Sequence, residues 1–192
     1  METAHFGNNV SIALLHYPVY DKNRLVVTTS VTNLDIHDIA RSAKTYGLFR
    51  YYIVTPVAEQ KALTERIRRH WLEGWGATYN PKRREALELV QVATDLKAAL
   101  AELAIVFGRP VKVVMTGAQG RPGSITTEVM AEMIKNDSQP YLLVFGTGWG
   151  MTEEVFSLAD IILEPIRGPV PYNHLSVRSA AAIILDRLFG ER

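Results

Sequence analysis

The stretch from Tyr141 to Gly150, YLLVFGTGWG, joins a run of apolar residues to a loop with three alternating glycines. The run from Tyr141 to Phe145 predicts a buried strand. Gly146, Gly148 and Gly150 allow the backbone to approach a ligand closely and to adopt conformations that other residues avoid. In an α/β sheet, ligands usually bind at the carboxyl ends of strands. The stretch therefore predicts either a ligand-binding loop or a tight strand-to-helix turn without a ligand.

Short apolar runs alternate with helical patterns along the rest of the chain. Further strands are predicted over residues 11–16, 25–29, 49–54, 111–115 and 160–163. Helices are predicted over residues 34–46, 58–75, 94–107, 125–134 and 175–189, with Asn33 and Thr94 placed as caps. This alternation predicts an α/β fold with a mostly parallel sheet and helices on both faces. Because no repeat or linker interrupts it, we expect a single domain over residues 1–192.

The composition restricts the class of protein. The 192 residues are 47% hydrophobic and 21% charged, which is ordinary for a globular domain. The net charge is +1, so a nucleic-acid partner would require the basic residues to gather on one face. The lack of cysteine excludes disulfides, thiolate zinc sites and cysteine nucleophiles. With no signal pattern in the first ten residues and no apolar run near ~20 residues, we expect a cytoplasmic protein without membrane contact or bound metal.

The glycine-rich segments match no nucleotide-binding fingerprint. In the loop from Gly146 to Gly150, the third glycine comes one residue too early for a dinucleotide motif, which disfavours an oxidoreductase. A second loop, Gly117 to Ser124, lacks the lysine of a phosphate-binding loop, and Pro122 removes a backbone donor. We expect this second loop to shape the wall of a site.

Two segments near the carboxyl end carry a family resemblance. Residues 164–168 read EPIRG, and residues 172–185 read YNHLSVRSAAAIIL. Together with the loop at 146–150, they resemble the C-terminal half of the SPOUT methyltransferases, in which a helix opens with Leu-x-Val-x-x-Ala-Ala. Leu175, Val177, Ala180 and Ala181 match that opening.

The N-terminal half is similar to the first motif of the ribose-methylating SPOUT branch. Asn33 precedes a helix that contains Arg41, and Tyr46-Gly47 closes it. The chain departs from that branch at residues 35–37, where a glycine is usual, at residues 147 and 148, where a glutamate is usual, and at Ser176, where an asparagine is usual. The resemblance covers residues 31–56 and 141–189, and it extends to a subfamily that stands alone or sits beside a tRNA guanine methyltransferase domain.

The resemblance implies an S-adenosylmethionine-dependent methyltransferase acting on RNA (tRNA or rRNA), at a ribose 2′-oxygen or a base nitrogen. It implies a deep C-terminal trefoil knot that holds the cofactor through loop backbone. The implied cofactor-binding residues are Phe145, Gly146, Thr147, Gly148, Gly150, Pro165, Ile166, Gly168, Asn173, His174 and Leu175. The implied catalytic residues are Arg41, Asn33 and Ser176. The alternative function is a non-catalytic module that binds S-adenosylmethionine and RNA.

Two further surfaces are predicted. Residues 180–185, AAAIIL, are apolar all round, so we expect the last helix to be covered by the sheet and by a second subunit of a homodimer; the alternative is a helix buried wholly within the monomer. Residues 66–85 mix cations with aromatic rings, which suits RNA contact through Arg68, Arg69, Lys82, Arg83 and Arg84. The alternative is that these cations are only solvated and that Trp71 continues a core stripe from Leu63 and Ile67.

Overall fold

The main sheet has six strands, and all of them run parallel. The computed structural model describes residues 8–191, so most of the polar N-terminal stretch lies outside the described residues. The strand order is β5-β4-β1-β7-β6-β8. The strands are β1 (Val10–Leu15), β4 (Tyr51–Val54), β5 (Val90–Ala93), β6 (Lys112–Met115), β7 (Tyr141–Gly146) and β8 (Ile161–Ile162). All their carboxyl ends therefore meet at one edge.

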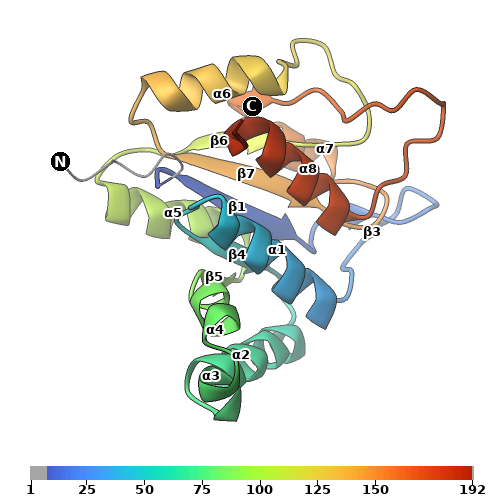
Figure 1. Ribbon diagram of the computed structural model, residues 1–192. Helices are drawn as coiled ribbons and strands as arrows, with labels where there is room; N and C mark the ends of the chain where they lie inside the picture. Colours follow the sequence, from blue (N-terminus) through green and yellow to red (C-terminus); the bar gives the residue numbers. More distant parts are fainter. Residues whose placement is uncertain (1–7, 192) are drawn as a thin grey trace.

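Helices cover both faces of this sheet (Figure 1). One face carries α1 (Asn33–Thr45), α6 (Thr127–Asn136) and α8 (Val177–Phe189). The other carries α5 (Leu96–Phe107) and α7 (Glu153–Phe156). The central strands are buried on both faces because nearly every residue in them is apolar, as β1 and β7 show. The predicted mostly parallel α/β fold is confirmed.

Three helices form a unit between β4 and β5, at the lower end of Figure 1. They are α2 (Ala58–Leu72), α3 (Trp75–Tyr79) and α4 (Pro81–Leu87). Neither α3, α4 nor β5 was predicted, since the sequence indicated one helix over 58–75 and no further element before residue 94, so this part of the prediction is wrong. Asn80 ends α3 and caps α4 by accepting from Arg83 N at 3.0 Å, while Pro81 occupies the first helical position. The turn residues thus start a helix here.

Both predicted helix caps are one residue away from the true caps. Thr32, not Asn33, accepts from Asp35 N at 3.1 Å, and Asp95, not Thr94, accepts from Ala98 N at 2.8 Å. In both cases the capping side chain accepts from the free N–H of the third helical residue, three positions further along the chain. Among residues 8–191, no helix has the length and hydrophobicity needed to cross a bilayer.

The predicted extended piece at 25–29 forms a separate hairpin. Its strands are β2 (Val19–Tyr20) and β3 (Val26–Val27), which pair antiparallel. The hairpin lies against the loop after β7, because Tyr20 N donates to Gly150 O at 2.8 Å and Trp149 N donates to Tyr20 O at 2.9 Å. The hairpin that follows β1 therefore fixes the position of the glycine-rich loop through backbone hydrogen bonds.

Candidate functional site

Three chain segments meet at the carboxyl edge of the sheet. They are the loop after β7 (residues 146–150), the loop after β6 (residues 117–124) and the segment between β8 and α8 (residues 164–176). Asn173 Nδ2 donates to Ala118 O at 2.8 Å. The rings of Trp149 and His174 lie edge to face, with their centroids 6.1 Å apart. The structure thus brings together the two segments in which cofactor-binding residues were predicted, 146–150 and 164–176, and it places the loop after β6 beside them.

Glycines in the loop after β7 allow a close approach of backbone to backbone. Gly148 has φ +60°, and a Cβ there would lie 2.8 Å from the carbonyl oxygen of Tyr20. A Cβ on Gly146 would lie 2.5 Å from Cγ of Met151. A tight turn therefore explains the presence of these two glycines without any bound ligand. Gly150, with φ +104° and open space around it, is exposed, as are Gly148 and Trp149.

Thr147 faces the protein rather than solvent. Its Oγ1 donates to the carbonyl of Leu15 at 2.9 Å and lies 2.5 Å from Oγ1 of Thr29, which lies 3.0 Å from Nδ1 of His16. Because the Leu15 carbonyl only accepts, the Thr147 proton is directed toward it. Thr147 then accepts from Thr29, and Thr29 accepts from His16. This hydrogen-bonded chain fixes the position of Thr147, and it places the His16 proton on Nδ1.

His16 was not predicted as part of the site. It is fully buried at the end of β1, and burial lowers its pKa to about 4 although the Asp35 carboxylate acts in the opposite direction. Nε2 is buried and has no hydrogen-bond partner among residues 8–191. The signal in the sequence was a polar residue at the carboxyl end of an apolar strand, the edge where ligands bind.

A buried ion pair joins the starts of α1 and α8. Asp35 Oδ1 accepts from Arg178 Nη1 at 2.8 Å, and Asp35 Oδ2 accepts from Thr32 Oγ1 at 2.6 Å. The Asp35 side chain is 7% exposed, whereas that of Arg178 is 32% exposed and also approaches Asp38 at 3.6 Å. The pair holds the last helix against the first at the edge where the loops meet. Neither residue was predicted as functional.

The predicted catalytic residues lie on two helices. Asn33 is the exposed first residue of α1, and Ser176 caps α8 by accepting from Ser179 N at 3.2 Å. Arg41 is exposed two turns further along α1, about 12 Å from Asn33 along the axis at ~1.5 Å per residue. Within one chain the structure therefore does not bring Arg41 together with the three loops.

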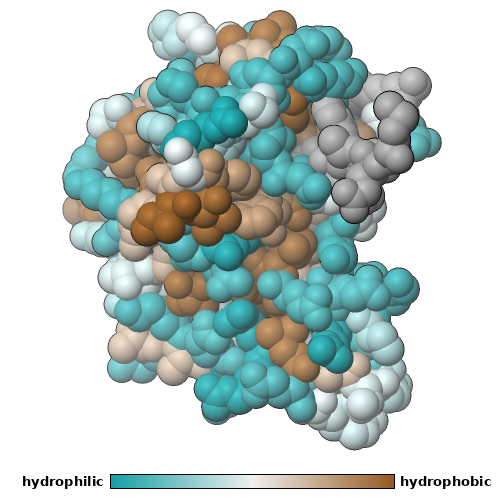
Figure 2. All heavy atoms as spheres, turned by 90° about the vertical axis from the view of Figure 1, so that its left-hand side faces the viewer, coloured by the Kyte–Doolittle hydropathy of each residue, from teal (hydrophilic) through white to brown (hydrophobic). Residues whose placement is uncertain are grey.

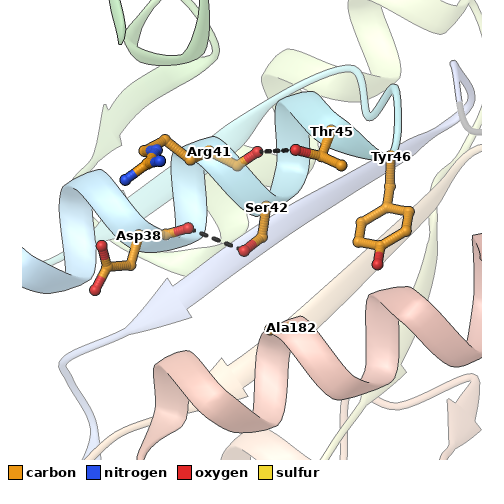
Figure 3. Close-up of a pocket in the computed structure, with 6 residues that line it drawn as sticks. All are labelled: Asp38, Arg41, Ser42, Thr45, Tyr46 and Ala182. Carbon is orange, nitrogen blue, oxygen red and sulfur yellow. Dashed lines mark hydrogen bonds between the residues drawn. The ribbon is translucent and has the colours of Figure 1, made fainter.

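Arg41 instead lines an open pocket of about 380 Å³ between α1 and α8 (Figure 3). Its guanidinium extends along the outer side of α1 toward the N-terminal end of that helix. Ser42 and Thr45 use their hydroxyls within α1, donating to the carbonyls of Asp38 and Arg41 at 3.0 and 2.9 Å. Arg41 and Asp38 are thus the charged groups that this pocket offers.

The predicted RNA-contacting cations all lie on the α2–α4 unit, in two different roles. Arg68 pairs with Glu65 at 2.7 Å, and the Arg83 guanidinium lies 4.7 Å from the ring of Trp71. Nε of both arginines is buried and has no hydrogen-bond partner among residues 8–191, so these two side chains lie against the unit rather than in solvent. The remaining members of the set, Arg69, Lys82 and Arg84, are exposed, and the latter two pair with Glu85 and Glu88.

Trp71 and Ile67 pack against the core below α1, as the alternative interpretation of this segment expected. Trp71 therefore belongs to the core while exposed cations remain around it. Among residues 8–191, no three or more His, Asp and Glu side chains gather in a way that could hold a metal ion.

Comparisons with known proteins agree with this arrangement. Residues 9–190 match a family described as SAM-dependent RNA methyltransferase. A tRNA (guanine-N(1)-)-methyltransferase of Nitratidesulfovibrio vulgaris is 46% identical over 96% of this chain but only 43% of its own length. An uncharacterized protein of Aquifex aeolicus is 42% identical over 96% of this chain and 90% of its own length.

A solved methylase-family structure from Neisseria gonorrhoeae shares the fold, with a TM-score of 0.65 at 19% identity, over 100% of this chain and 85% of that one. SpoU-type enzymes are among the other structures with this fold. This chain spans less than half the length of the tRNA methyltransferase relatives that it matches. The matched family and the relatives show that the chain belongs to the SAM-dependent RNA methyltransferases.

Proposed function

We propose that this chain transfers the methyl group of S-adenosylmethionine to a tRNA. The observation that carries the proposal is the meeting of the three loops at the carboxyl edge of the sheet, in a chain of this family. The Nitratidesulfovibrio relative, a tRNA (guanine-N(1)-)-methyltransferase, supports tRNA over rRNA. A tRNA substrate would place the activity in the cytoplasm. The Aquifex relative, which this chain matches over 90% of its length, supports a single domain over residues 1–192.

The proposed cofactor site uses backbone more than charged side chains. The walls are Phe145, Gly146, Thr147, Gly148 and Gly150, then Pro165, Ile166 and Gly168, then Asn173, His174 and Leu175. S-adenosylmethionine carries no phosphate, so loops without a phosphate-binding lysine fit it. The cofactor supplies an already activated methyl group. The protein therefore has to position the acceptor at about 3–3.5 Å and to manage its proton.

The proposed trefoil knot involves the last segment of the chain. Residues 164–176 run beside the loop at 117–124, where Asn173 bonds Ala118, before α8 packs between α1 and α6. This course supports the threading of the C-terminal segment through that loop, an exception to the usual rule against threaded chains.

The proposed homodimer accounts for the distance between Arg41 and the loops. Ala182 and Ile183 are only half-buried on α8, next to the open pocket that contains Arg41. A second copy packed on this face would cover these apolar side chains. Arg41 of one subunit would then reach the loops of the other, where Asn33 and Ser176 face the acceptor.

The function is tested by calorimetry with S-adenosylmethionine and by radiolabelled methyl transfer to total tRNA. We expect Arg41→Ala to lower methyl transfer about 10- to 100-fold while the cofactor affinity stays within about twofold, because Arg41 would position the acceptor rather than the donor. Lys44→Ala, which removes an exposed cation one turn further along α1, is the control and should keep full activity. Cofactor binding by the unaltered protein without transfer to any RNA would favour the non-catalytic module instead.

The glycine loop gives a separate prediction. We expect Gly148→Ala to weaken S-adenosylmethionine binding about tenfold, because a methyl group at φ +60° is strained and collides with Tyr20 O, which displaces the loop. Gly108→Ala is the matched control, since Gly108 has φ +65° with nothing within 4 Å and ends α5. Calorimetry should show normal affinity for the control. If Gly148→Ala and Gly108→Ala bind S-adenosylmethionine with equal affinity, the loop after β7 is not part of the cofactor site.

A further inference from the structure

The α2–α4 unit concentrates the positive charge of the chain. Residues 58–89 contain seven of the 21 lysines and arginines but only five of the 20 aspartates and glutamates, so their net charge is +2 in a chain of net charge +1. On the face shown in Figure 2, the surface at the lower end of the molecule is mostly hydrophilic or of intermediate hydropathy. Arg66, Arg69, Lys82 and Arg84 of this unit are all exposed. The positive charge of this unit favours a negatively charged polymer as its partner rather than a protein surface with few acidic residues.

Two aromatic rings lie exposed among these cations. Trp75 and Tyr79 on α3 stack on each other, with ring centroids 4.4 Å apart and an interplanar angle of 21°. Trp75 is 67% exposed and Tyr79 is 69% exposed. Trp71, by contrast, is half-buried beneath Arg83. The structure therefore separates a core tryptophan from a solvent-facing stacked pair, which the sequence alone could not do.

Two glycines hold this pair outward. A Cβ on Gly74 would lie 2.7 Å from His70 O, and a Cβ on Gly76 would lie 2.7 Å from Cε3 of Trp71. Glycine is thus required at both positions for α3 to pack so closely on α2. The inward side of α3 is taken by this contact, so the large rings on the same helix project into solvent.

We propose that the Trp75–Tyr79 pair is a stacking platform for an unpaired base of the RNA substrate. Exposed aromatic rings stack on bases that have left a helix, and each such contact contributes substantially to affinity regardless of sequence. Arg66, Arg69, Lys82 and Arg84 contact the adjoining phosphates. The inference rests on the proposed function and deepens it, because it assigns the substrate to RNA with a single-stranded loop or end.

The test measures the affinity of the full chain for total tRNA and for a 20-base-pair RNA duplex. Trp75→Ala should weaken tRNA binding about 5- to 100-fold, the range found for single base–aromatic stacks. Trp75→Phe keeps an aromatic face and should restore the affinity to within about threefold. The duplex should bind more weakly than tRNA and respond little to either substitution. Tryptophan fluorescence should be quenched by tRNA in the unaltered protein and less so in Trp75→Phe.

Ile105→Ala is the matched control, because Ile105 is 82% exposed on α5, across the sheet from α1. It should bind tRNA normally. Equal tRNA affinity for Trp75→Ala and the unaltered protein overturns the platform, as does equal binding of duplex and tRNA. If that variant also methylates tRNA normally, only the platform is wrong. If the unaltered protein neither binds nor methylates tRNA, the proposed function is wrong as well. The inference is also contradicted if this chain binds another protein through Trp75 and has no affinity for RNA.

Discussion

Replacing Arg178 with methionine lowers the free energy of unfolding by about 3 kcal/mol, because it leaves a buried carboxylate without its charged partner. Asp35 is buried, and among residues 8–191 only Thr32 would remain to donate to its side chain. Methionine keeps much of the aliphatic length of arginine, so lost packing contributes little. Urea unfolding followed by circular dichroism measures the change.

The matched control is Arg84→Met, which breaks the exposed pair with Glu88 on α4. Such surface pairs contribute about 0.5 kcal/mol or less, so this variant should unfold almost normally. Combining Asp35→Asn with Arg178→Met removes the charge that Arg178→Met leaves behind and should recover part of the loss. A loss below 1 kcal/mol for Arg178→Met would show that the pair does not hold α8 on α1.

Acidification from pH 7 to pH 4 lowers stability by up to about 3 kcal/mol through His16 alone. The pKa of His16 is about 4 in the folded protein, against 6.5 for an ordinary histidine. Between these values the unfolded chain binds a proton that the folded chain does not bind, so stability rises with pH. The contribution is complete above about pH 6.5 and is lost as the pH falls toward 4.

His16→Asn should flatten this pH dependence, whatever its effect on stability at pH 7. Urea unfolding at half-unit steps of pH gives the slope for each protein. His70→Gln, at an exposed histidine on α2, is the control and should keep the slope of the unaltered protein. Burial also lowers the pKa of His37, so some slope remains in His16→Asn. An unchanged slope would show that folding does not lower the pKa of His16.

The regular part of the fold could be predicted because periodicity reports burial. The apolar strands at β1, β4, β6 and β7 all lie in the parallel sheet. The prediction failed in the segment from 74 to 93, where α3 and α4 are short and α4 reads PKRREAL. A short charged helix carries too few apolar positions to show a stripe, and it forms here because Asn80 and Pro81 start it and α1 packs on it.

The site could be predicted as far as its loops, because glycine-rich loops after strands are visible locally. Its long-range partners could not. Asp35 and Arg178 are 143 residues apart, and their pairing follows only from the packing of α8 on α1. The same limit applies to the cations, since Arg68 and Arg83 look like Arg69 in the sequence but have buried Nε atoms. The knot, the dimer and the roles of individual residues stay predictions.

The central pairing of the sheet joins strands that the ribosome makes far apart in time. Val10 of β1 lies beside Tyr141 of β7, whereas the other neighbour of β1, β4, begins at Tyr51. At ~5–20 residues per second, the emerging chain waits on the order of ten seconds between β1 and β7. During that interval β1 has a free edge of apolar backbone, a template for aggregation. Nascent chains of this protein should therefore need protection by a chaperone until residue 146 has emerged.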